Sequence, residues 1–204
     1  MSTSLKTNNM RIPFLSFLLI LISQSIFCQI SLSDFKYEPT AAYPYGRPNP
    51  EAPEPIKDYK MLIGLSDCKS LTRNNEGEWR KDSVDVIWRF KYIMNGMAVQ
   101  DESLKADQVH TSSIRQYDNK EGKWYVTFYS SALPSKSITA WEGGMKGEEM
   151  ILYKEQKAPN GMDGFFKITF YDISEKGFNW KGEWVDKDEK FIYPTWHLFC
   201  TKRN

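Results

Sequence analysis

Residues 84–100, VDVIWRFKYIMNGMAVQ, decide the fold of this chain. Apolar residues recur there with the period of two of a half-buried β-strand, at Val84, Val86, Trp88, Phe90 and Tyr92. Asn95-Gly96 supplies the residues that a type I′ turn needs, and the chain then returns through Ala98, Gln100 and Glu102. The stretch therefore predicts an antiparallel hairpin.

Short alternating runs of the same kind fill the rest of the chain, and none carries a sustained helical stripe. Turn residues separate them at 118–122, 143–144, 159–161 and 175–177. This spacing predicts about ten strands. Sequential strands joined by short turns hide their edges best by closing on themselves. We therefore expect an all-β protein with a single closed antiparallel up-and-down β-barrel, and a two-sheet sandwich is the alternative.

Composition and charge limit the classes of function. Aromatic residues make up 15% of the chain, which favours sheet because aromatic side chains fit a pleated surface. The 27 lysines and arginines are balanced by 26 aspartates and glutamates, so no basic field is present to hold nucleic acid. We expect neither nucleic acid nor a membrane surface as a partner, and protein partners stay open.

The first 28 residues have the pattern of a secretory signal peptide. Lys6 and Arg11 precede an apolar run of 11 residues, 12–22 (IPFLSFLLILI), and a more polar stretch follows. The run is shorter than the roughly 20 residues of a membrane-spanning helix, so no stable membrane anchor is expected. Cleavage between Cys28 and Gln29 would give a periplasmic or extracellular protein, and lipidation of Cys28 is the alternative.

Two cysteines remain after such a cleavage, Cys68 near the start of the folded part and Cys200 near its end. In an oxidising compartment an even pair predicts a disulfide, which would join the first and last strands of a closed barrel. Two buried free thiols are the alternative, because Cα separations cannot be read from a sequence.

A proline-rich leader precedes the strands. Six of the ten prolines lie within 39–55, and they favour an extended course. We expect the leader to cross the barrel wall with Tyr43 and Tyr45 as anchors, and a short helix to begin near Pro55. The chain then has three parts: a signal peptide (1–28), an extended leader (29–58) and a β-barrel domain (59–204).

Several stretches carry a family resemblance: PEAPE (50–54), LIG (62–64), WRFKYIMNG (88–96), QDE (100–102), IRQYD (114–118), GKW (122–124) and FNWKGEW (178–184). Through them the chain resembles the DUF1579-type family of bacterial calycin-like, lipocalin-like proteins over most of residues 50–204. The resemblance implies a closed barrel with a central cavity. Calycin-like barrels usually have Gly-x-Trp on the first strand, whereas this chain has Gly64-Leu65-Ser66, which lacks the Trp.

Candidate ligand-binding residues are polar side chains on strands that should be half-buried, together with tryptophans that would fill a barrel: Trp88, Gln100, Glu102, Arg115, Tyr117 and Trp141. If the polar members point inward, Arg115 facing Glu102 would recognise a polar ligand. A solvated outer face is the alternative for these polar residues. The tryptophans are core residues first and a ligand wall second.

Motifs for metal, cofactor or nucleophilic chemistry are absent from the sequence. His110 and His197 have no companion ligands at metal-binding spacing, so no metal site is expected. His197 is the best candidate for a haem ligand, but a structural role is simpler, and we expect no cofactor. No Gly-x-Ser-x-Gly elbow or phosphate loop occurs, so catalytic residues stay unassigned.

The favoured hypothesis is an exported barrel that binds a small apolar or amphipathic molecule in its cavity. One alternative is an isomerase-type or lyase-type enzyme on the same barrel that uses Arg115, Tyr117 and Glu102. The other is a structural or partner-binding envelope protein.

Overall fold

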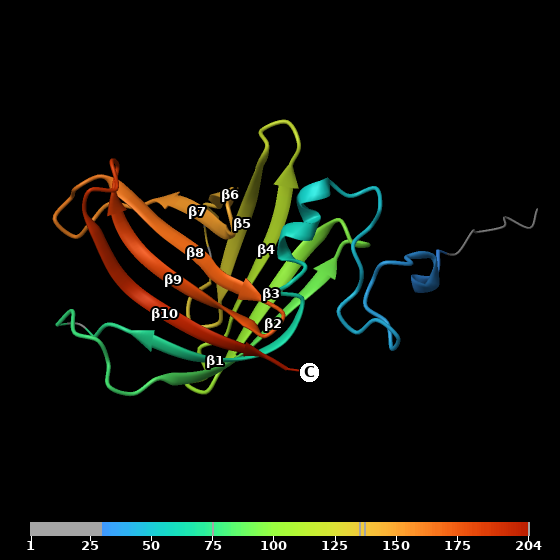
Figure 1. The fold of residues 1–204 in the computed structure, drawn as a ribbon, viewed down its shortest axis with the longest axis horizontal. Coiled ribbons are helices and arrows are strands. Elements are labelled where there is room, and N and C mark those ends of the chain that lie inside the picture. Colours follow the sequence, from blue (N-terminus) through green and yellow to red (C-terminus); the bar gives the residue numbers. More distant parts are fainter. Residues whose placement is uncertain (1–29, 75, 135, 137, 204) are drawn as a thin grey trace, which may run out of the picture. The chain divides into compact units, whose positions relative to one another are not determined.

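Ten strands close into one antiparallel barrel in the described part of the chain (Figure 1), as the sequence predicts. The computed structural model describes residues 30–74, 76–134, 136 and 138–203. The expected signal peptide and its cleavage site at Cys28/Gln29 lie outside these residues. The strands are β1 (Gly64–Thr72), β2 (Val84–Ile93), β3 (Ala98–Lys105), β4 (Thr111–Asp118), β5 (Lys123–Ser130), β6 (Trp141–Lys146), β7 (Glu149–Glu155), β8 (Gly164–Ser174), β9 (Gly177–Asp186) and β10 (Ile192–Lys202).

Every strand pairs with its neighbours in sequence, and β1 pairs with β10 to close the sheet. A closed sheet leaves no row of unpaired backbone groups, which excludes the sandwich alternative. Two short 3₁₀ helices precede the strands, η1 (Leu32–Asp34) and η2 (Glu54–Tyr59), and the second starts with Pro55 in its first turn as expected. No helix in the described ranges is long and apolar enough to cross a membrane.

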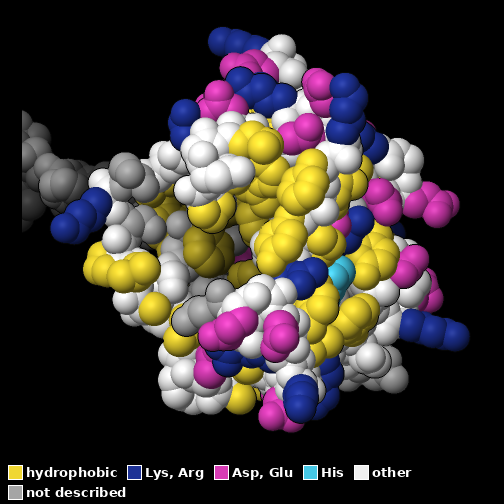
Figure 2. Space-filling view, turned by 90° about the vertical axis from the view of Figure 1, so that its left-hand side faces the viewer, with side chains coloured by type: hydrophobic (Ala, Val, Ile, Leu, Met, Phe, Trp, Pro, Cys, Tyr) yellow, Lys and Arg dark blue, Asp and Glu magenta, His cyan; other side chains and the backbone are white. Residues whose placement is uncertain are grey.

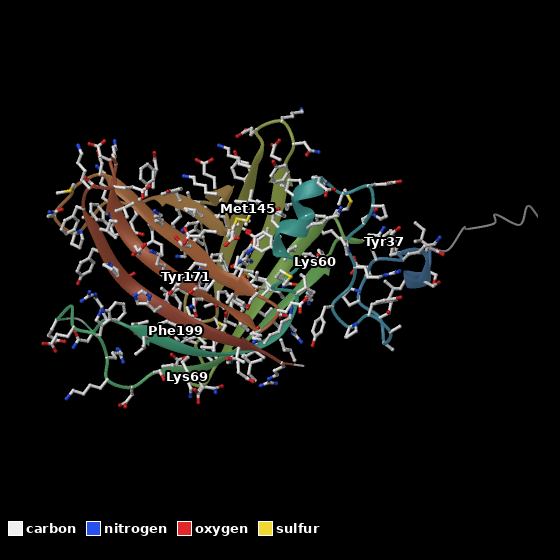
Figure 3. All side chains as sticks on the ribbon, viewed as in Figure 1. Tyr37, Lys60, Lys69, Met145, Tyr171 and Phe199 are labelled. Carbon is white, nitrogen blue, oxygen red and sulfur yellow. A yellow bond between two sulfur atoms is a disulfide. The ribbon has the colours of Figure 1, made fainter. Side chains whose placement is uncertain are left out.

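Alternation along each strand separates the core from the outer face. In β2 the inward side chains are those of Val86, Trp88, Phe90 and Tyr92, all of which are buried. Outward side chains such as Lys69 of β1 and Phe199 of β10 are largely exposed (Figure 3). The core is therefore the barrel interior, and its content decides what the protein can bind.

The seam between the first and last strands carries the two cysteines. Cys68 and Cys200 are direct partners in the β1–β10 register, with Cα atoms 4.1 Å apart and sulfur atoms at disulfide-bonding distance. The predicted pairing is confirmed at the level of this geometry. Both residues belong to the buried core, so the cross-link lies inside the packed wall.

The proline-rich leader packs on the β2–β3 hairpin. Asn49 donates from its backbone to Gly96 and from its side chain to the Asn95 carbonyl, both at 3.1 Å. Gly96 has φ +77°, and a Cβ there would collide with the backbone at Arg47 and Asn49, so the close approach requires glycine. Of the two expected anchors, Tyr45 accepts from Tyr92 N through its carbonyl. The ring of Tyr43 is exposed under the Arg47 guanidinium.

Candidate functional site

One end of the barrel is closed by η2. Tyr59 at its C-terminus is fully buried and meets Trp124 edge-on, with ring centroids 4.8 Å apart. Trp124 Nε1 donates to Asp58 Oδ2 at 3.0 Å, and Lys202 Nζ donates to the Met61 carbonyl at 2.7 Å. These contacts fill the barrel at the end where the β2–β3, β4–β5, β6–β7 and β8–β9 turns lie, which we call the closed end.

The opposite half of the barrel holds a cavity of about 250 Å³. Its wall is mainly aromatic, formed by Trp88, Trp141, Trp180, Trp196, Phe128 and Phe166. Polar residues on β3 and β4 complete it: Asp101, Ser103, Thr111, Ser113 and Arg115. A mainly apolar hollow with a few convergent polar groups is the usual form of a small-molecule site.

This cavity opens where the β1–β2, β3–β4, β5–β6, β7–β8 and β9–β10 connections lie, which we call the open end. Figure 2 looks onto the side where β1 and β9 end, and hydrophobic side chains surround a hollow there. The connections carry exposed apolar residues: Val109, Leu133, Ile138, Met162 and Phe191. An apolar entrance suits an apolar or amphipathic ligand.

A second, wider depression of about 850 Å³ lies over β1, β2, β3 and β10, with one residue of β9 at its edge. Two of its charged lining residues, Lys69 and Asp85, already form an ion pair with each other. It is therefore the weaker candidate, because its polar groups have partners within the protein.

The deepest polar feature of the cavity is an ion pair between Arg115 Nη1 and Asp101 Oδ2. Both side chains are almost fully buried, at 2% and 3% exposure, and the guanidinium carbon lies 5.1 Å from the Phe90 ring centroid and 5.2 Å from that of Tyr59. Burial raises the pKa of Asp101, and the Arg115 charge opposes that rise. The pair makes the deep part of the cavity polar but neutral overall.

Three buried N–H groups that line the cavity have no hydrogen-bond partner among the described residues: Trp88 Nε1, Trp141 Nε1 and Arg115 Nε. The Trp88 indole faces the Asp101 carboxylate and helps to lower the pKa of that group, so Trp141 Nε1 and Arg115 Nε are the two donors left over. Three further indoles of the barrel are bonded within the protein: Trp124 to Asp58, Trp184 to the Gln156 carbonyl at 2.9 Å and Trp196 to Ser70 Oγ at 2.8 Å. A buried donor without a partner is costly, so these two donors are the least satisfied polar groups of the cavity wall.

Two lysines lie on tryptophan faces near the open end. Lys154 Nζ is 3.7 Å from the Trp141 ring centroid, and burial lowers the pKa of this lysine. Lys105 Nζ is 5.5 Å from the Trp196 ring centroid and pairs with Asp107 at 3.2 Å. Cations on these faces hold the indoles in place.

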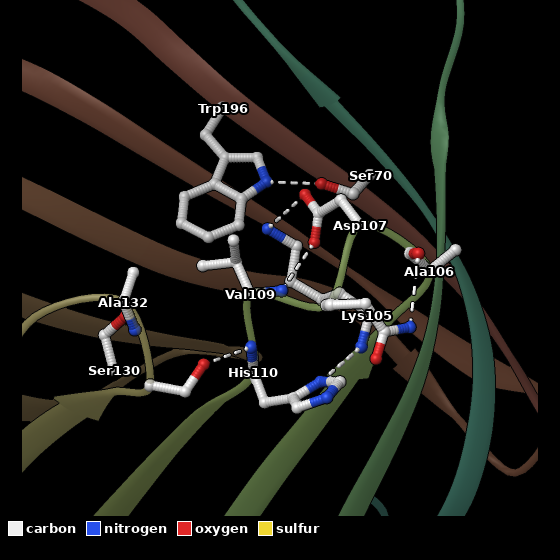
Figure 4. A network of polar contacts seen from close by, with 11 residues as sticks. Ser70, Lys105, Ala106, Asp107, Val109, His110, Ser130, Ala132 and Trp196 are labelled. Carbon is white, nitrogen blue, oxygen red and sulfur yellow. Dashed lines mark hydrogen bonds and ion pairs between the residues drawn. The ribbon is translucent and has the colours of Figure 1, made fainter.

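Hydrogen bonds hold the connections of the open end together (Figure 4). His110 Nδ1 accepts from Lys105 N at 3.2 Å, and His110 N donates to Ser131 Oγ at 2.9 Å. The β3–β4 turn is thereby tied to the chain that leaves β5. These bonds give His110 a structural role at the entrance.

Three of the residues proposed from the sequence line the cavity: Trp88, Arg115 and Trp141. Tyr117 also faces inward but lies toward the closed end, where its ring packs against Trp124 at 5.5 Å. It is not among the residues that line the cavity.

Gln100 and Glu102 lie on the outer face. Gln100 Nε2 donates to Ser112 Oγ at 3.2 Å, and Glu102 accepts from Arg89 Nη2 at 2.6 Å. Arg115 was expected to face Glu102 if both pointed inward, whereas it pairs with Asp101 in the structure. Arg115, Tyr117 and Glu102 therefore do not converge as an acid–base set.

Sequence reasoning missed Asp101, Ser103 and Ser113, although a signal for the first two was present. Counting outward from Asn95-Gly96 places Asp101 opposite Phe90 and Ser103 opposite Trp88, as in the observed register. Cross-strand partners share a face, so the inward positions of Phe90 and Trp88 carry over to them.

Metal and haem chemistry gain no support from the histidines. No cluster of three metal-ligating side chains occurs in the described ranges. His197 lies on the outer face, where its ring is 4.8 Å from that of Trp79 and 6.1 Å from that of Phe199. It does not line the cavity.

Comparison with known proteins adds no assignment, since the sequence matches no family model and no curated protein.

Proposed function

We propose that this chain is an exported β-barrel protein that binds a small apolar or amphipathic molecule in its open-ended cavity. The observation that carries the proposal is an aromatic-walled cavity of about 250 Å³ with two buried N–H donors left without partners. A protein that used this space only for packing would fill it, because interiors are close-packed.

Two features support export. The apolar run at 12–22 follows basic residues in the manner of a signal peptide, and the cysteines on β1 and β10 are placed to form a disulfide. The resemblance to calycin-like proteins agrees with a ligand-holding barrel.

The test is binding of a small ring compound, 2-acetonaphthone, to the purified protein by isothermal titration calorimetry. We expect one molecule per chain. Ser113→Phe, which places a ring inside the cavity, should weaken binding by about tenfold or more. Gln116→Phe is the matched control, because Gln116 is exposed on the same strand, and it should leave binding unchanged.

Native mass spectrometry of the protein from its own host would show a bound natural ligand as mass that is lost on denaturation. Equal affinities in the Ser113→Phe and Gln116→Phe variants would place the probe outside the barrel and contradict the proposal. No binding of the probe by the wild type, together with no bound mass, would contradict it as well.

A further inference from the structure

We propose that the cavity selects an uncharged, ring-containing ligand that carries a hydrogen-bond acceptor, as in a ketone or another carbonyl compound. This inference rests on the proposed function, since it specifies what the cavity binds. It uses three properties of the cavity: the shape of its wall, the polarity of its free groups and the balance of its charges.

The wall favours a flat ring of modest size. Four tryptophans and two phenylalanines line a space of about 250 Å³. Drug-sized ligands occupy pockets of roughly 300–1,000 Å³, so this cavity fits a smaller molecule. Aromatic side chains pack best against planar rings in offset or edge-on contact. A compact ring system therefore makes more contact with this wall than a flexible chain of equal size.

The free polar groups require an acceptor. An indole N–H and a guanidinium N–H can only donate, so Trp141 Nε1 and Arg115 Nε need an oxygen or another acceptor on the ligand. The Lys154 ammonium on the Trp141 ring polarises the indole and strengthens its N–H as a donor. A pure hydrocarbon would leave both donors unpaired.

The charge balance disfavours ions. Asp101 and Arg115 neutralise each other, so a buried anion would meet the Asp101 carboxylate and a buried cation would meet the Arg115 guanidinium. Of the lysines near the entrance, Lys105 is paired with Asp107. Lys154 lies on the Trp141 ring and is only partly buried, so solvent screens its charge. A neutral acceptor satisfies the donors without adding a buried charge.

Three probes of nearly the same shape separate these properties. They are 2-acetonaphthone, a neutral acceptor, 2-naphthoate, an anionic acceptor near neutral pH, and 2-isopropenylnaphthalene, which has no acceptor oxygen. Dissociation constants come from calorimetry or quenching of tryptophan fluorescence. We expect the ketone to bind at least about tenfold more tightly than the carboxylate, because the carboxylate adds a buried charge.

A matched pair of variants tests the donor. Trp141→Phe keeps an aromatic wall but removes the free N–H, and it should weaken ketone binding by roughly five- to tenfold with little effect on the hydrocarbon. Trp196→Phe makes the same change in the same wall, but its N–H is already bonded to Ser70. That variant should change the affinities for both probes by the same small factor.

Tighter or equal binding of the carboxylate would overturn the selection for uncharged ligands. Equal effects of Trp141→Phe on ketone and hydrocarbon would overturn the need for an acceptor. In both cases the barrel still binds a ring compound and the proposed function stands. Failure of all three probes to bind would reject the proposed function and this inference with it.

Discussion

The two ends of the barrel are built from the same ten strands but are filled differently. At the closed end, η2 inserts Tyr59 among Trp124, Phe170 and Arg115, and the interior is packed. At the open end, β3 and β4 line the cavity with the small side chains of Ser103, Thr111 and Ser113, and Lys105 lies beyond them on the Trp196 ring. The tryptophans opposite cannot fill the space that these small side chains leave.

Side-chain size along two strands therefore creates the cavity. The inward positions of β3 and β4 at the closed end are Val99, Arg115 and Tyr117, which are large or medium-sized. Interiors are otherwise packed to the density of organic crystals, so a stretch of small hydroxyl residues opposite aromatic rings creates room. The closed end is packed, and the open end keeps a cavity.

The largest expected effect comes from removing the disulfide between β1 and β10. Cys68→Ala with Cys200→Ala should lower the free energy of unfolding by about 4 to 5 kcal/mol in the chain-entropy model, because the cross-link spans 132 residues in sequence. Urea unfolding of the wild type with and without reductant provides the comparison. Both cysteines lie outside the cavity lining, so variant protein that is still folded should keep its affinity for 2-acetonaphthone. An unchanged urea midpoint would show that the bond does not form in solution.

The next largest effect is the loss of stability when an aromatic side chain is truncated at each end of the barrel. Tyr59→Ala at the closed end should cost about 3 to 5 kcal/mol, because the ring is fully buried in a packed site. Phe166→Ala at the open end should cost only about 1 to 2 kcal/mol, since Phe166 already borders a cavity. Denaturant unfolding measures both.

Phe191→Ala is the control for this pair, because Phe191 is exposed and should change stability by less than about 0.5 kcal/mol. Equal losses for the Tyr59 and Phe166 variants would mean that the open end is packed as firmly as the closed end.

The smallest expected effect concerns the outer face near the open end. Burial lowers the pKa of His197 below its usual value, and the nearby Lys181 and Arg73 charges act in the same direction against Glu183. His197 therefore binds a proton more readily in the unfolded state than in the folded state. Its contribution to the free energy of unfolding is present above about pH 6.5 and is lost as the pH falls.

We expect the stability of the wild type relative to His197→Gln to fall by less than about 0.5 kcal/mol between pH 7.5 and 5.5, since the ring is partly exposed. Unfolding at the two pH values measures the difference. Any effect of His110 drops out of the comparison, because both proteins contain that residue. A relative stability that rises on acidification would contradict the sign.

Much of the fold could be predicted because its signals are local. The alternation through Trp88 and Phe90 and the turn at Asn95-Gly96 need only neighbouring residues to be recognised, and the structure has that hairpin in the register that the turn sets. The site was harder to predict, because the inward or outward direction of each β3 side chain depends on the exact residue at which the turn ends. A shift of one residue exchanges the inward Asp101 for the outward Gln100 and Glu102.

Local signals are enough for the all-β class, the strand order and the neighbours of each turn, because period-two alternation and turn chemistry act over a few residues. Three features emerge only in the folded barrel: Asp101 pairs with Arg115, η2 fills one end, and Trp141 keeps a free N–H while Trp196 does not. These outcomes depend on side chains that meet across the barrel from strands far apart in sequence. No local pattern contains that distance information.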